Sequence, residues 1–275
     1  MNIFRYYKAE HGLSVLNDLV IRTSIPNTLN DPFELSPTID PAQFTQESAE
    51  AFLRTDHETE MWFQREGRKL GFTTKEQFMP WYLKNVPRLA AKLLPAVPKN
   101  VEDARQSFAE TFSAGWRMIC ASLVHDSILM WSHYADEHKG LVIQFDTSEA
   151  PFSQVPEYCI LTVMYSEKKV EYFHSEEFQE VQKRLFAVAA TKARVWDYER
   201  EVRIMIPVSP KILRESRYLP LAPHCITNVY FGCRCSAADR TSVRNALRRP
   251  ELAHVGLLQA HLNPSEYALT FISST

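Results

Sequence analysis

Residues 191–205, TKARVWDYEREVRIM, concentrate side chains whose types and spacing could do chemistry. A strand that begins near Glu199 would point Glu199 and Glu201 to one face, because side chains alternate along a strand. Arg203 would share that face. Two carboxylates about 7 Å apart at the backbone are close enough to grip a polyol from two sides, or to raise one pKa if unpaired. With Lys192 nearby, the pair is also a candidate for metal-assisted hydrolysis.

Two further polar clusters lie elsewhere in the chain. The stretch NTLNDPFE, residues 27–34, predicts a turn. Asn and Asp side chains form hydrogen bonds with the nearby backbone, and Pro32 keeps Asp31 out of the helical region. The stretch MWSHYADEHKG, residues 130–140, predicts a short helix that ends in polar residues. Its candidate side chains are Trp131, Ser132, His133, Tyr134 and Lys139.

Each candidate also has a structural interpretation. Glu201 and Arg203 could simply form a cross-strand ion pair with Arg194 or Lys192 at the rim of a sheet, which contributes little when exposed. Trp131 follows an apolar run and suits the core, and His133 could cap its own helix. Asp31 could serve an Asx-type turn without touching a ligand. The sequence leaves both interpretations open at each position.

The elements that must position these clusters follow from periodicity. Residues 41–113 show a 3.6-residue repeat interrupted by prolines, which predicts a helical insertion of about four helices. Elsewhere, strands rich in β-branched and aromatic residues mix with helices without regular βαβ alternation. The sequence therefore predicts one α+β domain over 1–275, with mixed or antiparallel central sheets and the helical insertion at about 41–113.

Composition narrows the function classes. A net charge of −2 gives no whole-molecule bias toward nucleic acid. Seven glycines form neither a dinucleotide-binding nor a P-loop motif. The five cysteines do not indicate a disulfide framework, and their spacing matches no familiar zinc pattern, so we expect no metal site. Apolar runs are too short to cross a bilayer and the first residues do not form a signal peptide, so we expect a cytoplasmic protein without membrane contact.

Four blocks together resemble the bacterial family DUF2971. They are SIPNTLNDPFE, CASLVHDSILMWSHYADEHKGLVIQFD, TKARVWDYEREVRIM and NVYFG, which follow the order and wording of that family. The resemblance covers most of the chain outside about 41–110, and its most specific parts are MWSHYADEHKG and W-x-Y-E-x-E-x-R. It implies a bacterial protein and supplies no activity.

The layout also resembles ADP-ribosyltransferase-like enzymes, which open a strand with E-x-E. There the glutamate holds a ribose hydroxyl of NAD and stabilises the oxocarbenium ion that forms as nicotinamide departs. The resemblance implies NAD as a substrate, with Glu201 on the nicotinamide ribose, Glu199 activating the acceptor and His133 beside them. It implies NAD contacts for Arg5, Tyr7, Ser24, Asn30, Asp31, Trp131, Tyr134 and Lys192. The chain lacks the Ser-Thr-Ser triplet of the best-known members.

The leading hypothesis is therefore an ADP-ribosyltransferase-like toxin or antiphage defence effector that modifies a nucleic-acid or protein acceptor and is held by a neutralising partner. Arg65, Arg68 and Lys69 in the insertion could contact the acceptor, although a solvated helix face also explains them. One alternative is a metal-dependent nuclease or phosphodiesterase that uses Glu199, Glu201 and Lys192. The other is a ligand-binding module without enzymatic activity.

Overall fold

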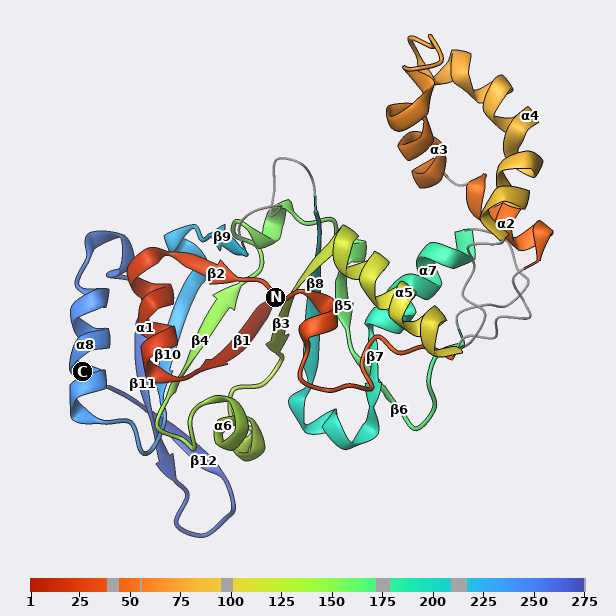
Figure 1. Cartoon of the computed structure of the whole chain (residues 1–275). Helices are drawn as coiled ribbons and strands as arrows, with labels where there is room; N and C mark the ends of the chain where they lie inside the picture. The colour runs from red at the N-terminus through yellow and green to blue at the C-terminus, as the bar shows by residue number, and fades with distance from the viewer. Residues whose placement is uncertain (39–44, 55, 95–100, 172–178, 209–216, 275) are drawn as a thin grey trace. The chain divides into compact units, whose positions relative to one another are not determined.

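The computed structural model divides the chain into two compact units, here called the sheet unit and the helical unit (Figure 1). The sheet unit comprises Met1–Glu34, Phe112–Glu167 and Ala190–Thr275, and the helical unit comprises Leu35–Thr111 and Lys168–Ala189. The structure describes residues 1–38, 45–54, 56–94, 101–171, 179–208 and 217–274.

One mixed sheet of eight strands dominates the sheet unit, in the order β12-β11-β10-β4-β1-β3-β8-β5. Neighbouring strands are antiparallel except for β10 and β11, which are parallel. The strands are β1 Asn2–Tyr7, β3 Trp116–Ser122, β4 Leu141–Asp146, β5 Ile160–Thr162, β8 Glu201–Pro207, β10 Ile226–Phe231, β11 Gly256–Leu262 and β12 Leu269–Ser273. This arrangement, together with the helices, confirms the predicted α+β class with a mixed central sheet.

Short elements complete the sheet unit. Two small sheets pair β2 (Val20–Arg22) with β9 (Tyr218–Pro220), and β6 (Met164–Ser166) with β7 (Thr191–Ala193). The helices α1 (Ala9–Asp18), α6 (Ile128–Tyr134) and α8 (Ala237–Leu247) belong to the same unit. Each of these helices is short and draws its stability from packing on the sheet rather than from its own length.

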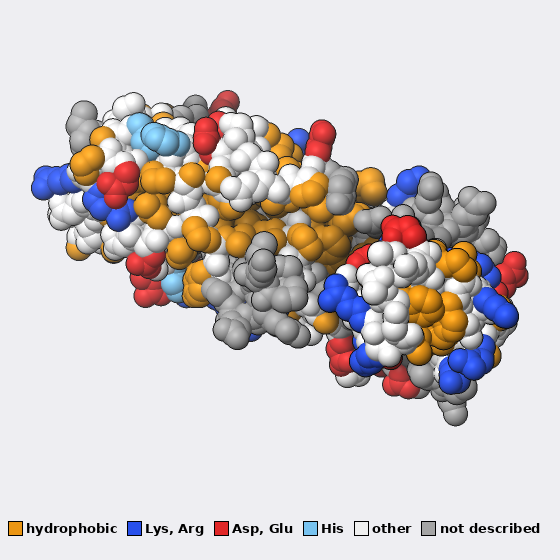
Figure 2. All heavy atoms as spheres, turned by 90° about the horizontal axis from the view of Figure 1, so that it is seen from above, with side chains coloured by type: hydrophobic (Ala, Val, Ile, Leu, Met, Phe, Trp, Pro, Cys, Tyr) orange, Lys and Arg blue, Asp and Glu red, His pale blue; other side chains and the backbone are white. Residues whose placement is uncertain are grey.

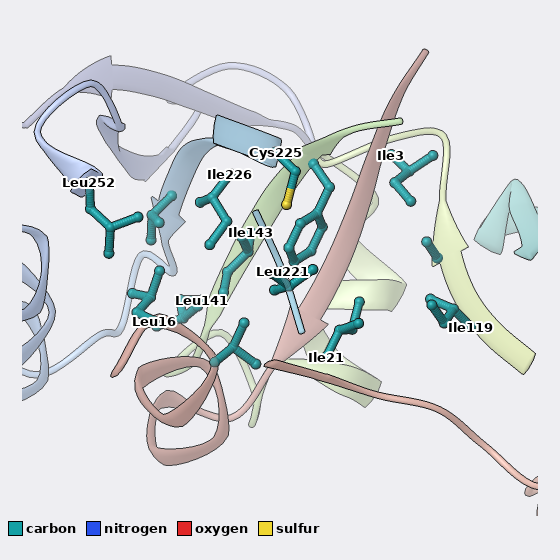
Figure 3. Packing of buried hydrophobic residues seen from close by; sticks show 14 of the residues in the cluster. Ile3, Leu16, Ile21, Ile119, Leu141, Ile143, Leu221, Cys225, Ile226 and Leu252 are labelled. Atoms are coloured by element: carbon teal, nitrogen blue, oxygen red, sulfur yellow. The ribbon is translucent and has the colours of Figure 1, made fainter. Parts of the chain in front are cut away.

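The alternation of side chains along β1 separates two cores. Ile3 lies on the face that belongs to one apolar cluster with Leu16 of α1 and Ile143 of β4 (Figure 3). Phe4 and Tyr6 lie on the opposite face, in a second apolar cluster that contains residues of α6. β1 is an interior strand because it pairs with β3 on one side and β4 on the other, and its apolar side chains divide between the two cores.

The helical unit has its own core. Its helices are α2 Gln46–Leu53, α3 Asp56–Trp62, α4 Lys75–Leu93, α7 Gln179–Ala189 and α5 Val101–Gly115, of which α5 enters the sheet unit at Phe112. Phe78, Tyr82 and Val86 of α4 are fully buried among aromatic and aliphatic neighbours. The insertion predicted at 41–113 thus lies largely in this unit, which also contains α7. Figure 2 shows an apolar patch on the surface of the unit with Lys and Arg side chains around it.

Candidate functional site

Five charged side chains of the sheet unit form one buried network, called here the charge network: Glu34, Lys192, Glu199, Glu201 and Arg203. The Lys192 Nζ lies 2.6 Å from Glu199 Oε2, 3.1 Å from Glu201 Oε2 and 3.2 Å from Glu34 Oε1. The exposed fraction of each of these side chains is 7% or less. The charge network is therefore almost closed to solvent.

Arg203 joins two of the carboxylates. Its Nε donates to Glu201 Oε1 at 2.8 Å and its Nη2 donates to Glu201 Oε2 at 2.9 Å, which makes a two-pronged contact. The same Nη2 contacts Glu34 Oε2. The guanidinium side chain is 0% exposed. Arg203 thus holds the carboxyl groups of Glu201 and Glu34 in fixed orientations.

The strand geometry of β8 explains part of this convergence. Glu201 and Arg203 share one face of the strand, while Val202 and Ile204 point into the core on the other face. In the register with β3, Arg203 lies opposite Cys120. Burial together with the neighbouring Glu201 raises the pKa of the Cys120 thiol. Cys120 is therefore not an activated nucleophile.

Glu199 belongs to a different element from the strand that the sequence predicts. It ends the 3₁₀ helix Arg194–Glu199, and Arg200 adopts the left-handed conformation with φ 45° before β8 begins at Glu201. The two glutamates are therefore not alternate residues of one strand, which corrects the sequence-based expectation. The turn is fixed in part by Ser122, whose Oγ donates to the Glu199 carbonyl at 2.6 Å.

The loop before Glu34 is the second stretch of the chain that contributes to the charge network, after residues 192–203. Asp31 Oδ1 accepts a hydrogen bond from the Phe33 backbone N–H at 2.9 Å, and the Glu34 N–H donates to the Asp31 carbonyl at 3.1 Å. This is the Asx-type turn that the sequence predicts. Asp31 is 6% exposed, and its Oδ2 has no hydrogen-bond partner among the described residues.

Helix α6 supplies the third segment. The Tyr134 hydroxyl donates to Glu199 Oε1 at 2.6 Å, and Asn30 Nδ2 lies 3.4 Å from the same hydroxyl. Since Asn30 is exposed and Tyr134 is partly exposed, this contact leads from the surface to Glu199. Glu199 is therefore linked to the surface through Tyr134 and Asn30.

The electrostatics of the charge network are uneven. Burial raises the pKa of Glu199, although Lys192 and Tyr134 oppose this. Burial would also raise the pKa of Glu201, but the adjacent Arg203 and Lys192 hold it below its usual value. Three carboxylates face two cations, so the network carries one excess negative charge when all its groups are ionised. Of Glu199 and Glu201, only Glu199 has its charged form disfavoured on balance, because burial outweighs its contacts with Lys192 and Tyr134.

The structure brings together only part of the predicted site. Glu199, Glu201, Lys192, Tyr134 and Asn30 meet as described, and the backbone of Asp31 braces Glu34. The exposed His133 lies nearby on α6, with its ring 6.4 Å from that of Tyr134 and 6.2 Å from that of Tyr198. The three polar blocks of the sequence therefore converge on one region of the sheet unit.

Arg5, Tyr7 and Trp131 do not join them. Arg5 and Tyr7 alternate with Tyr6 along β1 and so lie on the opposite face of the sheet, where Arg5 Nη1 donates to the Arg22 carbonyl at 2.8 Å. Trp131 is 0% exposed and leaves no ring face on which a nicotinamide could stack. Its indole Nε1 donates to the His125 carbonyl at 2.7 Å, so it is a core residue.

Two other predicted contacts take different positions. Ser24 pairs through its backbone with Met118 of β3. Arg194, proposed as a surface partner of Glu201, instead pairs with Glu167 at 3.3 Å. The residue that sequence reasoning missed as a member of the charge network is Glu34. Its only signal was a glutamate three positions after the Asp of a turn, which fixes its backbone but not its partners.

The described residues contain no group of three or more His, Cys, Asp or Glu side chains that could hold a metal ion. Three glutamates do meet in the charge network, but Lys192 and Arg203 already occupy their oxygens. A metal-dependent nuclease would need those oxygens free to bind its ions. The geometry therefore does not favour the nuclease alternative.

The protein is thus of the α+β class, and its sheet unit carries a buried charge network that the short helix α6 contacts through Tyr134. Residues 130–204 match the model of the family DUF2971, described as a protein of unknown function. The match confirms the resemblance to DUF2971 and includes every member of the charge network except Glu34. No curated protein and no solved structure matches the chain. No described helix is long and apolar enough to cross a membrane.

Proposed function

We propose that the protein is an ADP-ribosyltransferase-like enzyme in which Glu199, rather than Glu201, is the carboxylate that meets NAD. The observation that carries the proposal is the position of Glu199, whose carboxylate is linked to the surface through Tyr134 and Asn30. Cleavage of the bond to nicotinamide creates positive charge on the ribose. A fixed carboxylate in a low-dielectric site stabilises such a charge more strongly than water can.

The remaining members of the charge network have positioning roles in this proposal. Glu201 is held by two hydrogen bonds from Arg203, so it orients Lys192 rather than contacting the sugar. Lys192 in turn binds Glu199 Oε2 at 2.6 Å, while Tyr134 binds Oε1 at the same distance. When a cationic transition state forms beside Glu199, the three carboxylates are balanced by three positive charges. The charge network is thus prepared for the transition state and not for the resting state.

The acceptor in this proposal is a nucleic acid or a protein, and the activity suits a bacterial toxin or antiphage effector that acts in the cytoplasm under the control of a neutralising partner. This part extends the sequence-based hypothesis and has no support beyond it. Acceptor identity is a separate question from the chemistry at Glu199. Release of nicotinamide can be followed without knowing the acceptor.

The test is to incubate the protein with NAD labelled in its adenylate part, with and without bacterial lysate, and to measure nicotinamide release and transfer of label. Glu199→Gln should reduce the rate about 100-fold or more, the usual effect of removing one group that stabilises transition-state charge. Tyr134→Phe should give a smaller loss. Glu266→Gln and Tyr267→Phe, at exposed positions of the sheet unit, are matched controls and should leave the rate unchanged.

A rate that survives Glu199→Gln would refute the assignment. Loss of activity in Glu201→Gln alone, with Glu199→Gln active, would return the catalytic role to Glu201. Each variant must first be shown to fold, because the charge network is buried.

The near-complete burial of the charge network favours a second candidate, a ligand-binding module in which these five groups only brace the loop at Asn30 and helix α6. Such a module would be stabilised thermally by its ligand and would release no nicotinamide. Stabilisation by NAD without turnover would select this candidate over the enzyme.

A further inference from the structure

Three basic side chains follow one face of helix α4 in the helical unit. Lys84, Arg88 and Lys92 are spaced four residues apart, and all three are exposed. Residues four apart on an α-helix are neighbours on its surface and lie about 6 Å apart along its axis. The three cations therefore form a continuous line, called here the basic ridge, along the second half of α4.

The basic ridge has no carboxylate beside it that could neutralise it. Glu76 is the only acidic residue of α4, and it lies eight residues before the basic ridge begins. Another exposed cation of the same unit does have a partner, since Arg54 Nη2 lies 3.4 Å from Glu50 Oε2. No member of the basic ridge forms an ion pair within the described ranges of the chain. Its positive charge is therefore free to attract an anion from solution.

The stability of α4 does not account for this spacing. Like charges four residues apart on a helix repel each other and destabilise it. The negative end of the helix dipole stabilises a cation in the last turn, which explains Lys92. The dipole does not explain Lys84, which lies two turns earlier. A bound polyanion would remove the repulsion along the whole basic ridge.

The other side of α4 is committed to the core of the helical unit. Tyr82 and Val86 are 0% exposed. The Tyr82 hydroxyl donates to the Leu53 carbonyl of α2 at 2.7 Å, which fixes the rotation of α4 against its neighbour. Because this apolar face is buried, α4 cannot lay it into a lipid surface as an amphipathic membrane helix does. The basic ridge is thus presented on a rigid support.

An aromatic ring lies on the same face of α4. Trp81 precedes Lys84 by three residues and Arg88 by seven, which is the spacing of one helix face. Its indole is partly exposed and packs against Phe78, with ring centroids 5.6 Å apart. Proteins that bind single strands combine cations, which contact the phosphates, with aromatic rings on which the bases stack. An acidic protein surface would make no comparable use of the indole.

From these observations we propose that the basic ridge and Trp81 form a binding surface for single-stranded nucleic acid. Lys84, Arg88 and Lys92 contact phosphates, and Trp81 stacks on a base. The proposal goes beyond the function proposed for Glu199, because this binding requires no NAD and uses no side chain of the charge network.

Binding of fluorescently labelled oligothymidylate to the full chain, followed by anisotropy at increasing potassium chloride, tests the proposal. For single strands, each phosphate contact contributes about 0.7 to the slope of log affinity against log salt. Three contacts give a slope of about 2, so the affinity should fall about 20-fold between about 50 and about 200 mM salt.

The variants separate charge from stacking. Lys84→Gln and Arg88→Gln should each reduce the salt slope by about 0.7. Trp81→Leu should weaken binding about tenfold at every salt concentration and leave the slope unchanged. Arg54→Gln is the matched control, because Arg54 is an exposed arginine of the same unit that already pairs with Glu50, and it should change neither quantity. Circular dichroism checks that each variant keeps its helices.

The proposal is overturned if the oligonucleotide does not bind, or if Arg88→Gln has the salt slope of the parent. It is also overturned if a polyglutamate of equal charge binds as tightly, because the surface would then attract any polyanion. Binding to vesicles of phosphatidylcholine and phosphatidylserine in place of the oligonucleotide would assign the basic ridge to a lipid surface instead. Glu199→Gln should bind the oligonucleotide as the parent does, so failure of this surface and failure of the proposed function are distinguishable.

Discussion

Replacing Arg203 with methionine should destabilise the sheet unit strongly. The guanidinium is 0% exposed, makes hydrogen bonds of 2.8 and 2.9 Å to Glu201, and also contacts Glu34. Methionine keeps much of the volume but none of the charge, so three buried carboxylates would be left to share Lys192. Removing one partner of a buried ion pair costs about 3–5 kcal/mol. Because two carboxylates lose a partner here, we expect a loss near the upper end, about 4–5 kcal/mol.

The free energy of unfolding of the sheet unit can be measured from hydrogen exchange of β3 and β8 amides at increasing urea, which separates this unit from the helical one. The matched control is Lys139→Met. Lys139 Nζ lies 2.9 Å from Glu137 Oε2, as close as Arg203 lies to Glu201, but the two side chains are 44% and 68% exposed. Solvent screens that pair, so its loss should have little effect.

The reasoning fails if Arg203→Met and Lys139→Met cause similar changes, because burial would then not decide the strength of these pairs. A second variant sharpens the test. Adding Glu201→Gln to Arg203→Met removes one of the two orphaned charges and should recover part of the lost stability. If the double variant is instead as unstable as the sum of the single variants, Glu201 and Arg203 are not energetically coupled.

Three further outcomes follow from individual contacts. Burial raises the pKa of Glu199 above 4.5, so the folded protein binds the Glu199 proton more tightly than the unfolded chain does. The free energy of unfolding should therefore fall as the pH rises from 4.5 through the folded-state pKa of Glu199. Glu199→Gln should flatten a plot of urea midpoint against pH, and an unchanged slope would contradict this. Ser122→Ala leaves the Glu199 carbonyl and the Val124 N–H without their shared hydroxyl, and should cost about 1–3 kcal/mol in urea unfolding. Gly232→Ala places a methyl group against the His138 carbonyl and should lower the Tm, whereas an unchanged Tm would show that the turn can move.

Local patterns in the sequence determined several features. The alternation in EVRIMIPV fixed Glu201 and Arg203 on one face of a strand, because the side-chain period of a strand is two wherever it lies. The Asn-Asp-Pro stretch fixed the turn at Asp31, because an Asx-type turn needs only neighbouring residues. The 3.6-residue repeat between 41 and 113 predicted helices for the same local reason.

Only the tertiary structure decided which of these parts meet. The position of Glu199 depends on the left-handed Arg200, which no strand pattern reveals. The exclusion of Arg5 and Tyr7 depends on which face of β1 receives α6, a choice set by long-range packing. The charged side chains look like surface residues in the sequence. They form a buried network because the loop at Glu34 and strand β8 together cover them. Sequence spacing determines which side chains share a face, but the free energy of a charge depends on what covers it, and distant segments provide that cover.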